Sequence, residues 1–390
     1  MTTSGPCNAP DVVDVVALGE SMVTFLPSRP GRLADVPSFD RGIGGAESNV
    51  ACVLAAAGHA VKWVSRVGAD GFGDHLLETV GGYGVDVSAV RRDPARPTGV
   101  YFRTAGDRET DAHEVAYYRA GSAASAMAPG NMDLTTVRAG RVLHLSGITA
   151  ALSDDCLALL WELTAPRPDR PLVSFDVNFR AGLWRDTDGP RVLLDLARRT
   201  DIVFVGADEA RDAWGLHGAH ALVAALPEPD LLVVKQGGDG AVAFGKGVDE
   251  GFGNGVGEGF SNGVDEGFSD GDGDGVDEGV GKDPDGTATH VSAPHVDIVA
   301  AVGAGDAFAA GFLSGTLRDL PVRDRLRHGH LWAAAALTAP GDLAPPPARD
   351  HADRLVALDD DAWGRLRLGP GWTQAAKRAE KRAEKEVRTP

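Results

Sequence analysis

The residues best suited to chemistry are Gly303-Ala304-Gly305-Asp306, which precede a helix of small residues predicted over Ala307–Phe312. Glycines let the backbone approach a ligand closely, and successive N–H groups at a helix start form an anion hole. A carboxylate beside such a hole can accept the proton of an alcohol while the hydroxyl oxygen attacks a γ-phosphoryl group. The ordinary alternative is an aspartate that only caps a helix after a Gly-rich turn, so this motif alone leaves both interpretations open.

A second glycine motif, Gly44-Gly45-Ala46-Glu47-Ser48-Asn49, precedes a predicted helix early in the chain. Together with GAGDAFAAGF at 303–312, it resembles the two signatures of the PfkB (ribokinase-like) carbohydrate kinases, in the order that this family requires. The resemblance covers about Val12 to Asp342. It implies phosphoryl transfer from ATP to a sugar hydroxyl, with Asp306 as the general base and the Gly303–Gly305 amides as the anion hole.

The resemblance also implies a nucleotide site and a metal. Lys235-Gln236-Gly237-Gly238-Asp239-Gly240-Ala241 matches a segment that lies along ATP, although its sequence alone favours a plain hairpin turn. Glu209 matches a glutamate that organises Mg²⁺ through water, and a glutamate on a helix surface would look the same. The implied nucleotide-binding residues are Asn178, Arg180, Gly206, Lys235, Gly237, Gly238, Gly240, Gly303, Ala304, Gly305 and His330.

Within the family, the likeness is greatest to 2-keto-3-deoxygluconate kinases. It is carried by short phrases that include GESM at 19–22, YYR at 117–119 and DVNFR at 176–180. This likeness implies that a sugar acid is phosphorylated on its primary hydroxyl. The implied substrate-binding residues are Gly44, Gly45, Ala46, Glu47, Asn49, Tyr101, Tyr117, Arg119, Arg180, Asp306 and Asp342.

An anionic sugar invites guanidinium groups, because arginine pairs bidentately with a carboxylate. Arg119 and Arg180 can each supply one. For Arg119 the ordinary alternative is a strand with aromatic packing and a surface arginine, and for Arg180 it is a surface salt bridge. Arg180 follows the predicted strand Leu172–Asp176 at its ligand-facing end, which favours a functional role. A neutral-sugar kinase would instead need Asp and Asn side chains that bind hydroxyl groups.

Three positions depart from the family pattern. Gly206 replaces the Asn or Ser that often opens the N-x-x-E motif, which removes a side-chain contact to the nucleotide or to a metal-bound water. Ala300 stands where many members carry an aspartate linked to an activating monovalent cation, which weakens the case for potassium activation. His330 stands where relatives often have an asparagine near the adenine, so the nucleotide preference stays open.

The elements that must position these motifs alternate between strands and helices. This alternation predicts an α/β fold with a mostly parallel sheet covered on both faces, whose ligands bind at the carboxyl ends of the strands. The strands are predicted at 12–18, 61–67, 142–145, 172–176, 202–205 and 231–234, and the helices at 49–57, 73–82, 154–163, 191–199 and 208–214.

The domain organisation follows from the same pattern and from the resemblance. Tyr101–Arg103 and Val115–Tyr118 are β-prone runs with no helix between them, which predicts an antiparallel hairpin outside the main sheet. The resemblance implies a three-layer sandwich over 12–370 with a small β lid from about 20–40 and 95–120. We expect the charged segment at 371–390 to be a solvated helix or a frayed tail.

Residues 246–289 form a low-complexity, acidic, Gly-rich insertion. GVDEGFGN, GVGEGFSN and GVDEGFSD follow one another with a period of eight residues. The glycine content is too high and the apolar content too low to offset the entropy of ordering, so disorder is predicted. A Ca²⁺-binding Gly/Asp repeat is the alternative, although the spacing matches the nonapeptide pattern poorly.

Composition limits the partners. The chain has 43% hydrophobic and 24% charged residues and no apolar run near the ~18 residues of a membrane span. Of the net charge of −18, residues 246–290 contribute −10, and neither part offers the basic surface that nucleic acid or an anionic membrane requires. The start lacks a secretory pattern, and Cys7, Cys52 and Cys156 are far apart. We expect a cytoplasmic protein with small-molecule partners, and a homodimer or higher homo-oligomer stays open.

The sequence thus favours an ATP-dependent and Mg²⁺-dependent sugar-acid kinase. Two alternatives remain: a kinase of the same fold for fructose, ribose or a nucleoside, and a catalytically silent sugar-binding or regulatory protein. Gly206 and Ala300 support the silent protein, whereas the retained Asp306 and Glu209 argue against it.

Overall fold

An eight-stranded sheet forms the centre of the computed structural model, which describes residues 13–29, 31–104, 114–184, 188–245 and 288–374. The strand order is β14-β13-β12-β11-β10-β9-β1-β4, and β13 runs antiparallel to both of its neighbours, whereas all other pairs of this sheet are parallel. This confirms the predicted mostly parallel α/β sheet. The strands are β1 (Val15–Leu18), β4 (Val61–Val64), β9 (Val142–Ser146), β10 (Leu172–Asp176), β11 (Ile202–Gly206), β12 (Leu231–Lys235), β13 (Ala241–Gly245) and β14 (Ala288–Val291).

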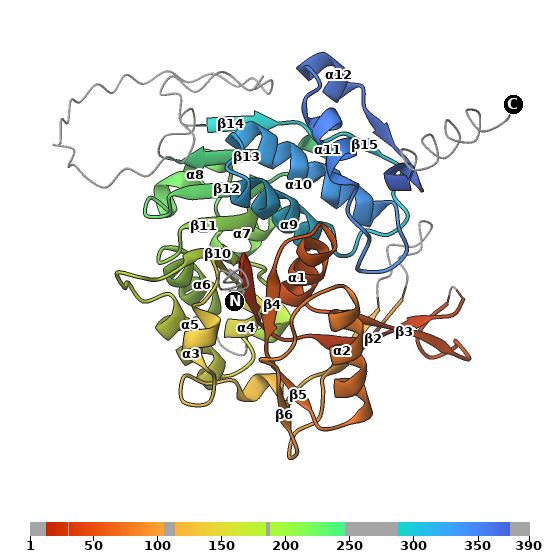
Figure 1. Cartoon of the computed structure of the whole chain (residues 1–390), viewed down its shortest axis with the longest axis vertical. Coiled ribbons are helices and arrows are strands. Elements are labelled where there is room, and N and C mark those ends of the chain that lie inside the picture. Colours follow the sequence, from red (N-terminus) through yellow and green to blue (C-terminus); the bar gives the residue numbers. More distant parts are fainter. Residues whose placement is uncertain (1–12, 30, 105–113, 185–187, 246–287, 375–390) are drawn as a thin grey trace, which may run out of the picture.

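The sheet is buried on both faces, because alternate side chains of each strand enter different apolar clusters. In β1, Val15 and Ala17 join one cluster, and Val16 and Leu18 join the other. The first cluster lies under α1, α9 and α10, and the second lies under α5 and α6 (Figure 1). Helices therefore cover both faces and complete the three layers.

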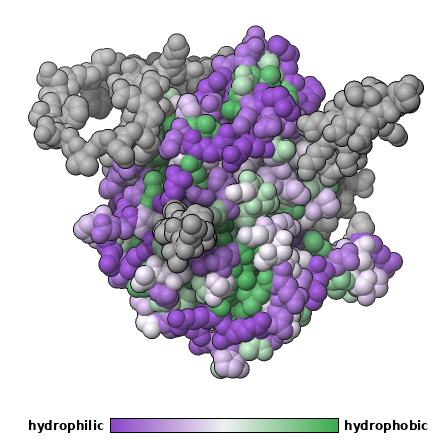
Figure 2. Space-filling model, in the orientation of Figure 1, coloured by the Kyte–Doolittle hydropathy of each residue, from purple (hydrophilic) through white to green (hydrophobic). Residues whose placement is uncertain are grey.

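The helices are α1 (Ala46–Ala56), α2 (Gly71–Gly82), α3 (Leu134–Val137), α4 (Gly147–Ala150), α5 (Asp154–Leu163), α6 (Gly189–Ala197), α7 (Ala207–Trp214), α8 (Ala219–Ala225), α9 (Ala304–Leu317), α10 (Val322–Leu337), α11 (Arg349–Val356) and α12 (Asp360–Gly364). None of the helices in the described residues is both long and apolar enough to cross a membrane. On the face shown in Figure 2, hydrophilic residues surround smaller apolar patches.

A separate four-stranded sheet lies beside α2, in the order β3-β2-β7-β8 (Figure 1). Its strands are β2 (Met22–Pro27), β3 (Phe39–Gly44), β7 (Val100–Arg103) and β8 (Val115–Tyr118). We call it the small sheet. The antiparallel pairing of β7 with β8 confirms the predicted hairpin. On one face Phe102 stacks on Phe25, with ring centroids 4.8 Å apart, and Tyr101 and Arg103 share the opposite face.

Some boundaries differ from the predictions. The run predicted as one strand at 61–67 is two strands, because β5 (Arg66–Gly68) leaves the main sheet after Ser65 and pairs with β6 (Arg91–Asp93). Helix α1 begins at Ala46, three residues before the predicted start. Strands β15 (His295–Val296) and β16 (Arg367–Leu368) form one further pair.

The predicted insertion and tail lie almost entirely outside the described residues. Within 246–289, only Ala288 and Thr289 are described, and they belong to β14. Of the tail, residues 371–374 are described, including the short 3₁₀ turn Trp372–Gln374. Cys52 and Cys156 are buried free thiols, and Cys7 falls outside the described part.

Candidate active site

A cavity of about 420 Å³ opens where β10 and β12 end, between the N-terminus of α9 and the small sheet. This is the edge at which a parallel sheet is expected to bind its ligands. It is lined by Glu20, Met22, Gly44, Gly45, Ala46, Asn49, Tyr101, Arg103, Val115, Tyr117, Arg119, Ile148, Asp176, Asn178, Arg180, Glu209, Lys235, Ala301, Val302, Gly303, Ala304, Gly305, Asp306 and Asp342.

Asp306 stands in the first turn of α9 and joins the two glycine motifs. Its Oδ2 accepts a 2.8 Å hydrogen bond from Nδ2 of Asn49, which lies on α1. The Asp306 side chain lines the cavity, but the surrounding protein shields most of it from solvent. This burial raises the pKa of Asp306 to about 7, the Asp176 and Asp342 carboxylates add to the increase, and the Asn49 bond and Lys235 oppose it.

The start of α9 has the backbone geometry that the predicted anion hole requires. Gly303 caps the helix at a φ of 78°, a left-handed conformation that favours glycine. A Cβ there would overlap the carbonyl oxygen of Asp342, so no larger residue fits. Within the described residues, the amides of Ala304 and Gly305 donate to no backbone acceptor. These N–H groups are therefore available to an anion, beside the positive end of the helix dipole.

Lys235 is the last residue of β12, and its side chain reaches the start of α9. Its Nζ donates to Oδ2 of Asp176 at 2.9 Å, and a Cβ on Gly305 would lie 3.7 Å from that nitrogen. Burial by itself would lower the pKa of Lys235, but the Asp176 and Glu209 carboxylates raise it above its ordinary value. The lysine therefore keeps its positive charge beside the N-terminus of α9.

Glu209 sits in the first turn of α7 and accepts hydrogen bonds from the backbone amides of Gly206, at 2.9 Å, and Phe179. Burial raises the pKa of Glu209, and the nearby Asp176 raises it further. In the described part of the chain, no three His, Cys, Asp or Glu side chains are close enough together to hold a metal ion by themselves. Because Mg²⁺ commonly takes one or two carboxylates and completes its shell with phosphates and water, Asp176 and Glu209 fit a metal held mainly by the nucleotide.

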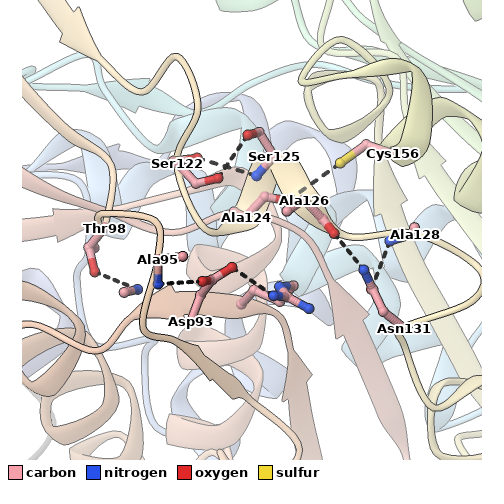
Figure 3. Close-up of polar contacts among 12 residues, drawn as sticks. Asp93, Ala95, Thr98, Ser122, Ala124, Ser125, Ala126, Ala128, Asn131 and Cys156 are labelled. Carbon is pink, nitrogen blue, oxygen red and sulfur yellow. Dashed lines mark hydrogen bonds and ion pairs between the residues drawn. The ribbon is translucent and has the colours of Figure 1, made fainter.

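The small sheet contributes two arginines, each already paired with a carboxylate. Arg103 pairs with Asp342, and Arg119 pairs with Glu20. Ser122, in the turn after Arg119, donates to Oε1 of Glu20 at 2.6 Å. The hydroxyl and carbonyl of Ser122 also bind Ser125 and hold this turn (Figure 3). Arg180, in contrast, is exposed and forms no ion pair with a described carboxylate.

The structure brings most of the predicted site residues to this cavity, but not all. Glu47 is fully buried behind it and accepts hydrogen bonds from Ser146 and Thr149 at 2.7 and 2.6 Å. His330 is buried on α10, with Nε2 lying 3.1 Å from the carbonyl oxygen of Val291. The predicted residues that do not line the cavity are Glu47, Gly206, Gly237, Gly238, Gly240 and His330.

Three of these residues, Gly237, Gly238 and Gly240, lie in the turn that follows β12. Gly237–Asp239 make a short 3₁₀ turn between β12 and β13, and Gly237 and Gly238 are exposed there. The predicted strand, Gly-rich turn and second strand are therefore confirmed as a hairpin. Ala300 does not line the cavity, and its amide donates to the carbonyl of Leu337 at 3.3 Å.

Three charged lining residues were missed by the sequence analysis: Glu20, Arg103 and Asp176. Two had a signal. Asp176 is the last residue of a predicted strand, where parallel sheets place ligand-binding groups. Arg103 lies two residues after Tyr101 on the same strand, so both side chains must share a face. Glu20 follows β1 in a loop, and no periodicity could have assigned it.

A larger cavity of about 870 Å³ lies elsewhere, between the C-terminal half of α9, α10 and the residues around α11. Its lining includes Arg318, His328, Trp332 and Arg349 but no carboxylate. The smaller cavity holds the carboxylates, the lysine and the helix N-terminus that phosphoryl transfer needs, so chemistry and not size identifies the site.

The comparisons with known proteins point to one family. Residues 13–256 and 274–349 match the family described as "pfkB family carbohydrate kinase". A 2-dehydro-3-deoxygluconokinase of Bacillus subtilis is 32% identical over 344 residues, which cover 87% of this chain and 94% of the relative. A crystal structure of a PfkB protein from Polaromonas sp. JS666 superposes with a TM-score of 0.69 at 29% identity, covering 87% of this chain and 99% of that one. A sugar kinase from Pyrococcus horikoshii, solved in complex with ATP, gives a TM-score of 0.68 at 21% identity, covering 90% of this chain and 99% of that one.

Proposed function

Because this chain belongs to the pfkB family of carbohydrate kinases, we propose that it transfers the γ-phosphoryl group of ATP to the primary hydroxyl of 2-keto-3-deoxygluconate and forms the 6-phosphate. This substrate is the 2-dehydro-3-deoxygluconate in the name of the Bacillus relative. We propose that the reaction takes place in the cytoplasm, where ATP is available.

The observation that carries the proposal is the position of Asp306 beside the amides that open α9. With a pKa of about 7, its carboxylate is ionised in a large fraction of molecules at neutral pH and is still basic enough to take a proton. In the proposed step, Asp306 accepts the hydroxyl proton as the sugar oxygen bonds to phosphorus, and the bond from phosphorus to the ADP oxygen breaks. The Ala304 and Gly305 amides then stabilise the charge on the transferred group.

The charged residues near Asp306 have separate proposed roles in binding the nucleotide and the metal. We propose that Lys235, held by Asp176 at 2.9 Å, contacts the phosphates near Gly305. Asp176 and Glu209 are the residues that would hold Mg²⁺, directly or through water. When bound, the metal supplies positive charge to the phosphates. The small sheet lies over the cavity as a lid, and its closure would keep water from the phosphoryl group.

For the acid group of the sugar, Arg180 is the strongest candidate. It lines the cavity, and within the described residues no carboxylate neutralises it. Arg119 also lines the cavity, but Glu20 already pairs with it. Of the two arginines predicted to bind an acid group, only Arg180 is therefore without a carboxylate partner in the described structure. This favours a second candidate function, a kinase for a neutral sugar such as fructose or ribose.

A coupled assay of ADP release separates the two candidates. MgATP is supplied with 2-keto-3-deoxygluconate, its galactonate epimer, fructose, ribose or gluconate, each with and without potassium. Turnover restricted to the keto-deoxy acids supports the proposal, and faster turnover of fructose or ribose rejects it in favour of the neutral-sugar kinase. Because Ala300 replaces the cation-linked aspartate, we expect potassium to leave the rate unchanged.

A further inference from the structure

Asp342 connects the small sheet to the start of α9. It lies in the segment between α10 and α11 and is buried, with 8% of its surface exposed. Tyr101 donates to its Oδ2 at 2.7 Å, and Arg103 pairs with its Oδ1. Both oxygens of the carboxylate are thus engaged by adjacent positions on one face of β7.

The backbone of Asp342 is pressed against the anion hole at the same time. A Cβ on Gly303 would overlap the Asp342 carbonyl oxygen, and a Cβ on Gly44 would overlap the Tyr101 hydroxyl and lie 2.8 Å from Asp342 Oδ2. Four segments therefore meet without spare room: β7, the end of β3, the Asp342 segment and the start of α9. A movement of one of them must displace another, because a close-packed interior cannot absorb it.

The pair at the centre of this junction is buried on both sides. The side chains of Arg103 and Asp342 are 5% and 4% exposed. Removing one partner of such a pair leaves an uncompensated buried charge, which costs far more than removing an exposed one. The Asp342 carboxylate also acts on Asp306, whose pKa it helps to raise. Through Asp342, Arg103 can therefore affect both the geometry of the start of α9 and the pKa of Asp306.

We propose that Arg103 is a positioning residue that, through Asp342, couples the small sheet to the start of α9 (Gly303–Asp306), so that the lid and the anion hole are assembled together. The inference rests on the proposed function, since it concerns the helix start that would bind the transferred phosphoryl group. Arg103 acts in it by holding Asp342 and needs no contact with the substrate.

The test compares Arg103→Gln with a matched control, Arg66→Gln. Arg66 pairs with Asp93 at 2.7 Å between β5 and β6, and this pair also has low exposure but does not line the cavity (Figure 3 shows Asp93). We expect Arg103→Gln to lower kcat/KM for the sugar at least about tenfold and to release several ADP molecules for each sugar phosphate formed, because the lid no longer excludes water. Arg66→Gln should keep one ADP for each sugar phosphate.

The pH profile gives a second reading that a purely structural role would not change. Without Arg103, the negative charge of Asp342 is no longer neutralised, so the pKa of Asp306 rises and the acidic limb of kcat/KM moves to higher pH. Arg66→Gln should leave that limb in place. Tyr101→Phe removes the hydroxyl that donates to Asp342 but keeps the ring and the Arg103–Asp342 pair. It should show the ADP excess more weakly and serves as the test if Arg103→Gln does not fold.

Hydrogen exchange tests the coupling without any turnover. In Arg103→Gln we expect faster amide exchange in peptides spanning 300–306 and 338–344 as well as in β7, whereas Arg66→Gln should change only the β5–β6 region. Exchange that increases in β7 alone, together with unchanged ADP stoichiometry, overturns the inference. An inactive wild-type enzyme would reject the proposed function, and the exchange data would still decide the coupling.

Discussion

Nδ2 of Asn49 donates a 2.8 Å hydrogen bond to Oδ2 of Asp306 and so ties α1 to α9 at the floor of the cavity. Each residue belongs to one of the two glycine motifs, which are far apart in the sequence. The bond favours the ionised carboxylate, whereas burial and two neighbouring carboxylates favour the protonated one, and the balance leaves the pKa of Asp306 at about 7.

The first prediction is a pH dependence of the reaction. A general base works only when ionised, so kcat/KM should fall about tenfold for each pH unit below the pKa near 7 and reach a plateau above it. Initial rates of ADP release from pH 5 to 9, at subsaturating sugar, measure this profile. A rate that stays level from pH 5 to 7 would show that no such base acts.

The second prediction concerns the bond from Asn49. Asn49→Ala removes the donor that stabilises the ionised Asp306, so the pKa of the carboxyl rises and the acidic limb shifts to higher pH. Activity should drop at pH 7 and recover in large part at pH 9. Asn131→Ala is the control, because Asn131 also makes amide hydrogen bonds but holds a turn that does not line the cavity (Figure 3). An unshifted limb in Asn49→Ala would contradict the assignment.

A third prediction separates backbone strain from steric overlap. Gly303 and Gly58 both have a positive φ, of 78° and 93°. A Cβ on Gly303 would overlap Asp342, whereas one on Gly58 meets nothing within 4 Å. Gly58→Ala should cost about 1 kcal/mol of unfolding free energy and leave kcat unchanged. Gly303→Ala should cost more and also reduce kcat at least about tenfold, since the anion hole must shift. Urea denaturation and the coupled assay measure the two effects, and equal kinetics in both variants would refute the overlap argument.

Much of this site could be predicted because its parts have local signatures. The GAGD and GGAESN motifs predict glycine-rich helix starts, and the strand pattern predicts the edge of the sheet at which they meet. The GAGD motif alone makes Asp306 a candidate, whereas Asn49 was assigned through the family resemblance, and the structure shows that the two side chains are hydrogen-bonded. Tyr101, Tyr117 and Arg119 were assigned to the site through the family resemblance. The hairpin that carries the two tyrosines was predicted from the β-prone runs, and the structure confirms this hairpin.

The rest depends on contacts between distant segments, which no periodicity records. Arg119 was predicted to receive an anion, but Glu20 neutralises it from a loop almost 100 positions earlier. Glu47 sits inside a predicted binding motif, yet the helix turns its carboxylate toward Ser146 and Thr149. Asp342 could be placed at the site, but its two partners on β7 became evident only with the tertiary structure.

The fourth prediction concerns the acidic insertion. Phe244 pairs with Ala288 at the ends of β13 and β14, so the two strands are neighbours where the insertion begins and ends. A short turn can join antiparallel neighbours. Replacing residues 247–286 with a Gly-rich turn of about four residues should therefore keep kcat/KM within about twofold. A large loss of activity in a variant with unchanged thermal stability would show that the insertion takes part in the reaction.

The most direct test of the account is the turnover of 2-keto-3-deoxygluconate by the wild-type enzyme and by Asp306→Asn, measured as ADP release, with sugar binding measured by calorimetry. Asp74→Asn is the control, because Asp74 also lies in the first turn of a helix, α2, but is half exposed and away from the cavity. We predict that Asp306→Asn lowers kcat by about 10²- to 10⁴-fold and changes the Kd for the sugar only a few-fold, while the control keeps the wild-type rate. An Asp306→Asn enzyme with a near-normal kcat would contradict the role of Asp306 as the base.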